Sequence, residues 1–160
     1  MSEIRSKARR LKERAEIELI IVDYLQLVKD NEKLDRHLQI GNISRGLKAL
    51  ARELSVPVIA AAQLNRGVEQ RSTREKRPML ADLRESGSIE QDADQVVLIY
   101  QQVAEDGTNA PGQDSYPVDL IVAKNRNGPT GDVHMMFHRK FTRFELAARA
   151  LPSDFARTPA

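Results

Sequence analysis

Residues 19–27 read LIIVDYLQL, and residues 57–67 read PVIAAAQLNRG. The apolar, β-branched run that opens the first stretch is typical of a strand covered on both faces in a parallel sheet. The second stretch contains a similar run at 58–62, and residues 43–54 between them carry apolar side chains at helical spacing. Strand, helix and strand in this order predict a βαβ unit with a right-handed crossover. We therefore expect an α/β fold.

The helix of this unit is expected to begin near Ile43, with Asn42 as its candidate N-cap, because residues 29–42 are polar and predict a loop. It should end before Pro57, since the residue preceding a proline avoids the α region. A separate helix is expected over residues 3–15, where apolar side chains recur at helical spacing.

The second half of the chain predicts shorter elements. Helical stretches are expected around Leu83 and Ile89, interrupted at 86–88, and residues 96–100 predict a third buried strand. Three further strands joined by turns are expected at 118–123, 133–137 and 141–146. We assign residues 1–150 to one domain and residues 151–160 to a flexible tail.

Composition excludes several classes of protein. No apolar run approaches the ~20 residues that span a bilayer, and the charged N-terminus is not a secretory signal. With no cysteine, disulfides and zinc–thiolate sites are excluded. The formal net charge of +2 is too small to argue by itself for nucleic-acid binding. We expect a globular cytoplasmic protein without a membrane partner.

Two polar side chains come directly after the paired strands. Asp23 ends the first strand, in the arrangement called Walker B, and Gln63 follows the second. Ligands of open α/β folds bind at this edge, where a carboxylate can hold Mg²⁺ through water beside phosphates and an amide can contact a γ-phosphate or the attacking water. Taken alone, an aspartate that begins a loop or a structural glutamine explains the same pattern.

Four segments in one order carry a resemblance that the strands alone do not. They are residues 19–27, residues 57–67, residues 77–94 (RPMLADLRESGSIEQDAD) and residues 124–131 (KNRNGPTG). Together they resemble the second half of the motor domain of the DnaB-type replicative DNA helicases, over roughly residues 3–148. The resemblance implies a RecA-like P-loop NTPase core fragment, with a mostly parallel sheet flanked by helices and a C-terminal antiparallel hairpin region.

One part of such a motor does not occur in the sequence. No G-x-x-x-x-G-K-[ST] stretch is present, so we expect the phosphate-binding loop and the catalytic glutamate upstream of Met1. The 160 residues alone are expected to be inactive. A cut piece, a split gene and a degenerate copy all remain open.

The resemblance assigns ATP and Mg²⁺ as cofactors, and it makes Asp23 the residue that binds both, the metal through water. Gln63 becomes the sensor of nucleotide state, although Ala62 stands where the family usually has Ser or Thr. Lys124 and Arg126 leave a strand one residue apart and on the same side, just before a tight turn. By resemblance they act on a neighbouring subunit's γ-phosphate, Arg126 as an arginine finger. From their spacing alone, a basic surface hairpin is the competing interpretation.

By the same resemblance, residues 77–94 face the channel of a ring and contact the backbone of single-stranded DNA through Arg84, Glu85 and Gly87. Arg84 can neutralise a phosphate, and Gly87 allows main-chain N–H groups to approach an oxygen closely. Contacts of this kind make binding independent of base sequence and sensitive to salt.

Taken together, these features predict part of an ATP-dependent helicase that translocates on single-stranded DNA and unwinds the duplex at the replication fork. The intact protein is expected to form a homo-hexameric ring, with primase and a helicase loader as further candidate partners. Two alternatives stay open: a non-catalytic fragment that interacts with helicase rings, and a different RecA-like ATPase, against which DYLQL and RESGSIEQDAD argue.

Overall fold

The structure is a computed structural model that describes residues 1–30, 34–68, 71, 77–101 and 114–147. Within these ranges, the side chains of Arg66 and of residues 84–86 are outside the description. The expected tail at 151–160 lies outside the described residues as well.

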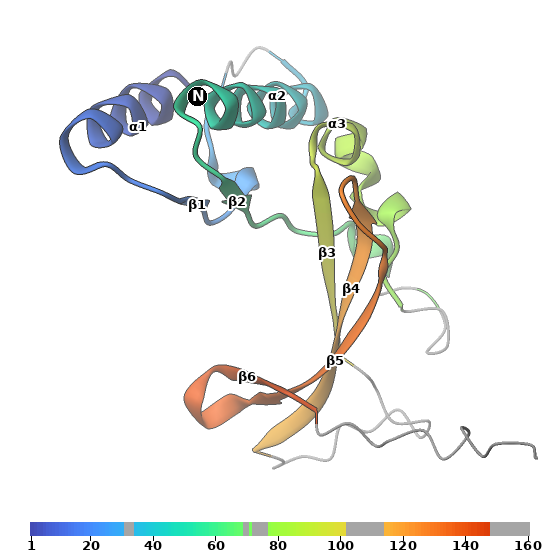
Figure 1. The fold of residues 1–160 in the computed structure, drawn as a ribbon. Helices are drawn as coiled ribbons and strands as arrows, with labels where there is room; N and C mark the ends of the chain where they lie inside the picture. Colours follow the sequence, from blue (N-terminus) through green and yellow to red (C-terminus); the bar gives the residue numbers. More distant parts are fainter. Residues whose placement is uncertain (31–33, 69–70, 72–76, 102–113, 148–160) are drawn as a thin grey trace, which may run out of the picture.

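Two helices, α1 (Ser2–Ala15) and α2 (Arg36–Leu54), lie above a parallel pair of strands, β1 (Ile20–Val22) and β2 (Val58–Ala60) (Figure 1). Ile20 pairs with Val58 and Val22 with Ala60, so the two strands run in register with α2 as their connection. The predicted strand–helix–strand unit and the N-terminal helix are confirmed.

Helix α2 is longer than the sequence predicted. It begins at Arg36 with Asp35 as N-cap, so the expected loop up to residue 42 and the cap at Asn42 were wrong. Ile40 is only 4% exposed and extends the apolar stripe of Ile43 by one turn. Burial of this stripe outweighs the polar composition around it, because tertiary packing supplies most helical stability in proteins.

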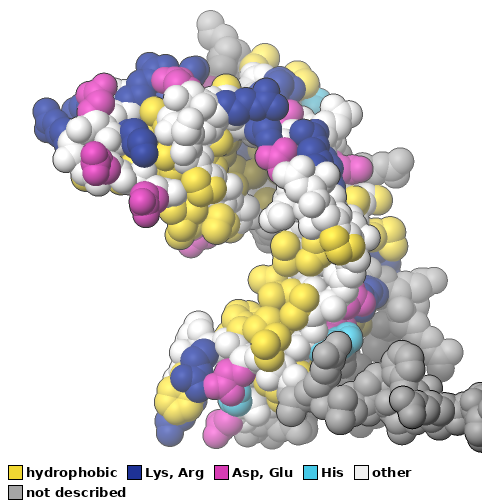
Figure 2. All heavy atoms as spheres, viewed as in Figure 1, with side chains coloured by type: hydrophobic (Ala, Val, Ile, Leu, Met, Phe, Trp, Pro, Cys, Tyr) yellow, Lys and Arg dark blue, Asp and Glu magenta, His cyan; other side chains and the backbone are white. Residues whose placement is uncertain are grey.

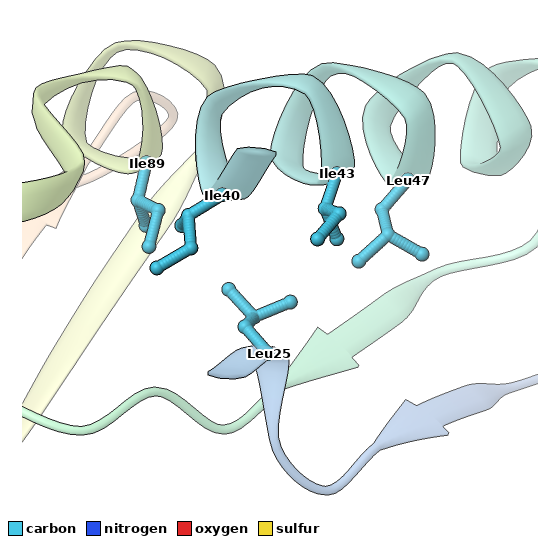
Figure 3. Packing of buried hydrophobic residues seen from close by; sticks show 5 residues of the cluster. All are labelled: Leu25, Ile40, Ile43, Leu47 and Ile89. Carbon is cyan, nitrogen blue, oxygen red and sulfur yellow. The ribbon is translucent and has the colours of Figure 1, made fainter. Parts of the chain in front are cut away.

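The main core lies between α2 and the strand ends below it (Figure 3). Leu25, on the short 3₁₀ turn η1 (Leu25–Leu27), points up toward α2. The buried members of this cluster are Leu25, Ile40, Ile43, Leu47 and Ile89. Leu25 is only 2% exposed and packs in the same cluster as the fully buried Ile43, so the motif that follows β1 is anchored directly in the core.

Ile89 belongs to a pair of abutting helices, η4 (Leu80–Ser86) and α3 (Gly87–Asp92). Helical structure around Leu83 and Ile89 is as predicted, but Gly87 has right-handed helical dihedrals and α3 follows η4 directly. Leu83 packs in a second cluster against Val96 and Leu98 of the next strand. A further 3₁₀ turn, η2 (Arg66–Val68), follows the residues after β2.

The remaining strands form an antiparallel sheet in the order β3-β4-β5-β6. Their bounds are β3 Gln95–Gln101, β4 Ser115–Asn125, β5 Gly131–His138 and β6 Arg143–Leu146, with the 3₁₀ turn η5 (Arg139–Phe141) before β6. The α/β class is confirmed, with a larger antiparallel share than a mostly parallel sheet would give: of the strand pairs described, only β1–β2 is parallel. Residues 126–130, which join β4 to β5, are too few for the crossover that parallel neighbours need.

One face of each sheet is open. Burial on both faces was expected for the apolar strands, yet Ile21 is 66% exposed, Ile59 56% and Ile99 61%. In Figure 2, apolar side chains gather along the hollowed side of the molecule. The apolar runs predicted the strands correctly, but nothing among the described residues covers these side chains. None of the described helices has the length and apolar character needed to cross a bilayer.

Candidate functional site

Asp23 and Gln63 emerge at the same edge of the parallel pair. The main-chain N–H of Ala61 donates to Val22 O at 2.9 Å, and that of Leu25 donates to Ala61 O at 2.9 Å, so pairing continues beyond both strands. The Asp23–Tyr24 peptide is cis. Both candidate side chains are exposed. The carboxyl ends of β1 and β2 therefore present a carboxylate and an amide next to each other.

Gln63 is held by a residue that the sequence analysis did not single out. Gln26 Nε2 donates to Gln63 O at 3.2 Å, and the Gln63 N–H donates to Gln26 Oε1 at 3.2 Å. Arg36, at the start of α2, donates to Gln26 O. The position of Gln26 within DYLQL was the available signal, but the spacing alone could not identify its partner 37 residues away.

The arrangement around Asp23 suits a hydrated magnesium ion. Within the part of the chain that the structure describes, its carboxylate has no hydrogen bond or ion pair, and no cluster of three or more His, Asp or Glu could enclose a metal. Mg²⁺ keeps several waters and is usually held by one or two carboxylates together with substrate phosphates. A single exposed carboxylate at a strand end fits that chemistry, whereas a cage made only of protein ligands does not.

The candidate DNA segment is anchored by Asp82, which the sequence analysis also missed. Asp82 is 5% exposed; it accepts from the Met79 N–H at 2.8 Å and from Arg71 Nη1 at 3.1 Å. A carboxylate in the first turn of a helix is a common cap, and that was the signal in the sequence. The side chains of Arg84 and Glu85 lie outside the described residues, so their predicted contacts stay predictions.

Gly87 is the first residue of α3 and is exposed. A Cβ built there would have no atom within 4 Å, and its φ is −49°. The described surroundings therefore do not require glycine at this position.

A second anchor joins the same segment to the antiparallel sheet. Arg77 Nη1 lies 3.1 Å from Asp119 Oδ2, and its Nη2 lies 2.5 Å from Asp132 Oδ2. Asp119, 2% exposed, also lies 2.6 Å from His134 Nδ1. His134, whose side chain is 66% exposed, thus contacts the same buried carboxylate as Arg77. This network fixes the point from which residues 78–94 begin.

Lys124 and Arg126 point to the same side, as predicted, and both donate to carbonyls in the last turn of α3. Lys124 Nζ lies 2.5 Å from Glu90 O and 3.5 Å from Gln91 O, while Arg126 Nη2 lies 2.7 Å from Gln91 O. No hydrogen bond or ion pair among the described residues joins these cations to Asp23 or Gln63. The structure therefore gathers the predicted residues into two groups rather than one.

Asp94 completes the second group. Its Oδ1 lies 3.3 Å from Arg126 Nη1, and its Oδ2 pairs with Lys48 of α2. The hydrogen bond from Lys48 lowers the pKa of the Asp94 carboxyl below its ordinary value, with further lowering by the charges of Arg126 and Arg52. Asp94 is therefore ionised near neutral pH and places a negative charge just beyond the end of α3.

Asn125 shapes the turn that follows these cations. Its Nδ2 donates to Pro129 O at 3.2 Å, and its Oδ1 accepts from the Asn127 N–H at 3.3 Å. A Cβ at Gly128 would lie 2.8 Å from Asn125 Nδ2, so the turn closes tightly around this amide. The Asn125 amide therefore holds together the turn that follows the two cations.

Comparison with known proteins assigns the whole of this architecture to one family. The model of the DnaB-like helicase C terminal domain matches residues 1–146. The chain is 48% identical over 146 residues to the replicative DNA helicase DnaB of Geobacillus stearothermophilus, covering 90% of this chain and 31% of that protein. It is 47% identical to the replicative DNA helicase DnaC of Bacillus subtilis, again covering 90% and 31%. It therefore spans about a third of the length of these relatives.

Solved structures are similar as well. One is an ATPase domain, with a TM-score of 0.77 at 42% identity, covering 91% of this chain and 50% of that one. Another is a DnaB-like replicative helicase, described with its primase interactions, with a TM-score of 0.74 at 42% identity, covering 88% and 33%. The similarity thus extends to the folded arrangement as well as to the motifs.

Proposed function

The chain belongs to the DnaB-like helicase C-terminal domain family, and we propose that it supplies the second half of the motor of an ATP-dependent replicative DNA helicase. The assembled motor would translocate on single-stranded DNA and unwind the duplex at the fork. Named replicative helicases at 47–48% identity support this interpretation and argue against a different RecA-like ATPase. Hydrolysis and unwinding are proposed for the complete motor, since the 160 residues contain no phosphate-binding loop motif.

The observation that carries the proposal is the shared edge of β1 and β2, where Asp23 and Gln63 emerge together. Asp23 would hold Mg²⁺ through water beside the phosphates of ATP, and the ion would neutralise charge that develops there. The Gln63 amide would contact the γ-phosphate or the attacking water. Gln26 supports that role because it fixes both main-chain groups of Gln63.

Lys124 and Arg126 would act on the nucleotide of a neighbouring subunit in a hexameric ring. Two features support action in trans: no hydrogen bond or ion pair among the described residues joins the pair to Asp23, and the Arg126 side chain is 45% exposed at a turn. A guanidinium beside the γ-phosphate would stabilise charge in the transition state.

Arg84, Glu85 and Gly87 would contact the backbone of single-stranded DNA. The open surroundings of Gly87 support this, since a phosphate could approach its main chain. Primase and a helicase loader are further proposed partners; primase is suggested by the solved relative described with it.

A chimera tests the function directly. Residues 1–146 of this chain would replace the matching segment of the Geobacillus stearothermophilus DnaB, and hydrolysis of ATP and unwinding of a forked duplex would be measured. We expect both activities, and we expect Asp23→Asn to abolish both while the ring still assembles. A chimera that folds and assembles but neither hydrolyses ATP nor unwinds DNA would contradict the proposal.

The open apolar faces around Ile21, Ile59 and Ile99 favour one alternative, a non-catalytic fragment that joins helicase rings. Mixing the purified 160-residue chain with intact Geobacillus DnaB would test it. Inhibition of unwinding together with an inactive chimera would favour the fragment over the motor.

A further inference from the structure

The candidate DNA contacts and the two candidate cations, Lys124 and Arg126, are linked through α3, which is only six residues long. It begins at Gly87, next to the candidate DNA contacts, and its last turn accepts from Lys124 and Arg126. The Arg126 N–H also donates to Asp94 O at 2.9 Å. The last carbonyls of a helix lack partners within the helix and attract cations. One short helix therefore has the DNA segment at one end and the candidate finger at the other.

Asp94 ties the finger to its own subunit. Its carboxylate is divided between Lys48, on helix α2, and Arg126, at the end of β4. Lys124 donates to the carbonyls of Glu90 and Gln91 in the last turn of α3, so the two cations paired with Asp94 are Lys48 and Arg126. Of these cations, Arg126 is the one at the exposed turn, where a long side chain can change direction while its strand stays in place.

The contact is weak enough to be reversible. Arg126 is 45% exposed and Asp94 51%. Exposed ion pairs contribute little because water and salt compete with them. Such a pair biases where a side chain lies without holding the fold together.

We propose that Asp94 and the last turn of α3 form a cis dock that retains Arg126 within its own subunit until DNA displaces α3. Asp94 is then a positioning residue that keeps hydrolysis low when no DNA is bound. DNA contacting residues 84–87 would shift the helix that carries the carbonyl acceptors and would release the guanidinium toward the neighbouring nucleotide. This inference rests on the proposed function, because it assumes that Arg126 acts in trans.

The test uses the active chimera and its rate of ATP hydrolysis with and without an oligothymidylate. Asp94→Asn should raise the DNA-free rate roughly threefold to fivefold, the range of bias that an exposed ion pair can set. It should leave the rate at saturating DNA within about twofold, so that stimulation by DNA falls. Asp94→Glu, which keeps the charge, should restore the low DNA-free rate.

Two further variants distinguish the release of Arg126 from a nonspecific destabilisation of the fold. Glu53→Gln neutralises another half-exposed carboxylate, paired with Arg9 away from the dock, and should change neither rate. Lys48→Met removes a competing cation from Asp94, so the DNA-free rate should stay the same or fall. A rise with Lys48→Met as large as with Asp94→Asn would overturn the dock.

The remaining outcomes are equally decisive. An unchanged DNA-free rate in Asp94→Asn, in a chimera that Asp23→Asn inactivates, would reject the dock and leave the proposed function standing. An equal fall of both rates with a lower Tm would make Asp94 merely structural and would also reject it. An inactive parent chimera would overturn the proposed function and this inference with it.

Discussion

Gln26 and Gln63 hold each other through two reciprocal hydrogen bonds of 3.2 Å, in which one side chain pairs with both main-chain groups of the other residue. Just after β2 ends, the Gln26 side-chain amide takes the place of a neighbouring strand, because it bonds both the N–H and the C=O of Gln63. The candidate sensor is therefore oriented by a residue of the motif that follows β1, which links the two strand ends at which Asp23 and Gln63 emerge.

Replacing Gln26 should impair Gln63 without unfolding the protein. Gln26→Ala removes two partly exposed hydrogen bonds, so we expect a loss of about 1 kcal/mol in unfolding free energy and a roughly tenfold lower turnover of the chimera. Gln39→Ala is the matched control, since it also removes two side-chain hydrogen bonds, one donated to Leu34 O at 2.7 Å and one accepted from Arg36 Nη1 at 2.8 Å. Equal turnover in the two variants would show that the orientation of Gln63 is unimportant.

Arg126→Ala should lower turnover of the chimera roughly 10³-fold or more while nucleotide affinity changes only a few-fold. Mixing it with a variant that lacks the phosphate-loop lysine of the DnaB portion should partly restore hydrolysis, because some mixed interfaces contain both intact halves. The recovery should rise and then fall with the mixing ratio. If the subunits exchange but the mixture never hydrolyses ATP faster than either variant alone, Arg126 does not act in trans.

Two glycines give opposite expectations for stability. Gly41→Ala should cost about 1–3 kcal/mol, because its Cβ would overlap Ser88 Oγ and lie 3.3 Å from Ser88 Cβ. Gly87→Ala should be neutral or stabilising by up to about 1 kcal/mol, since nothing lies within 4 Å. Urea unfolding of the chimeras checks both values.

Gly87→Ala has a second readout, because it should weaken binding of single-stranded DNA while the fold is retained. The loss should be similar for all base sequences, since only the DNA backbone is contacted. Arg84→Ala should also reduce the salt dependence of binding by about one charge. A loss confined to particular base sequences would instead indicate base readout.

The buried carboxylate of Asp119 makes Arg77 a stabilising residue. Arg77→Ala leaves this carboxylate with fewer partners, so we expect a loss of about 1–3 kcal/mol. Arg143→Ala breaks a pair with Glu145 in which both side chains are exposed, and it should cost less than about 0.5 kcal/mol. If thermal unfolding gives the same loss of stability for both variants, the burial of Asp119 does not make its ion pair more important than the exposed one.

The Asp94 contacts should be lost in acid. Its pKa is lowered in the folded state, chiefly by Lys48, so its contribution is fully present above the ordinary aspartate pKa of about 4 and is lost as pH falls through the lower folded value. The difference in unfolding free energy between the parent chimera and Asp94→Asn should be under about 1 kcal/mol. It should be constant from about pH 7 to about pH 5 and shrink below about pH 4; a difference that grows in acid would have the wrong sign.

The local elements and the order of the motifs were predictable from the amino-acid pattern alone. The β-branched run at 19–22, the helical spacing at 43–54 and the run at 58–62 were enough for the βαβ unit, because each pattern reports a local preference. The positions of Asp23 and Gln63 at one edge followed, since the carboxyl ends of parallel strands coincide. The roles of Lys124 and Arg126 came from resemblance, with their common direction predicted from their spacing.

Which surfaces contact each other could not be predicted from the sequence and became clear from the folded arrangement. Ile40 extends α2 because Leu25 and Ile89 bury it, and Ile21 is open because no described residue covers it. Gln26 meets Gln63 across 37 residues, and Arg126 meets Gln91 across 35. Hydrogen bonds and burial between distant segments depend on how whole elements pack, and hydrophobic periodicity does not specify the partner.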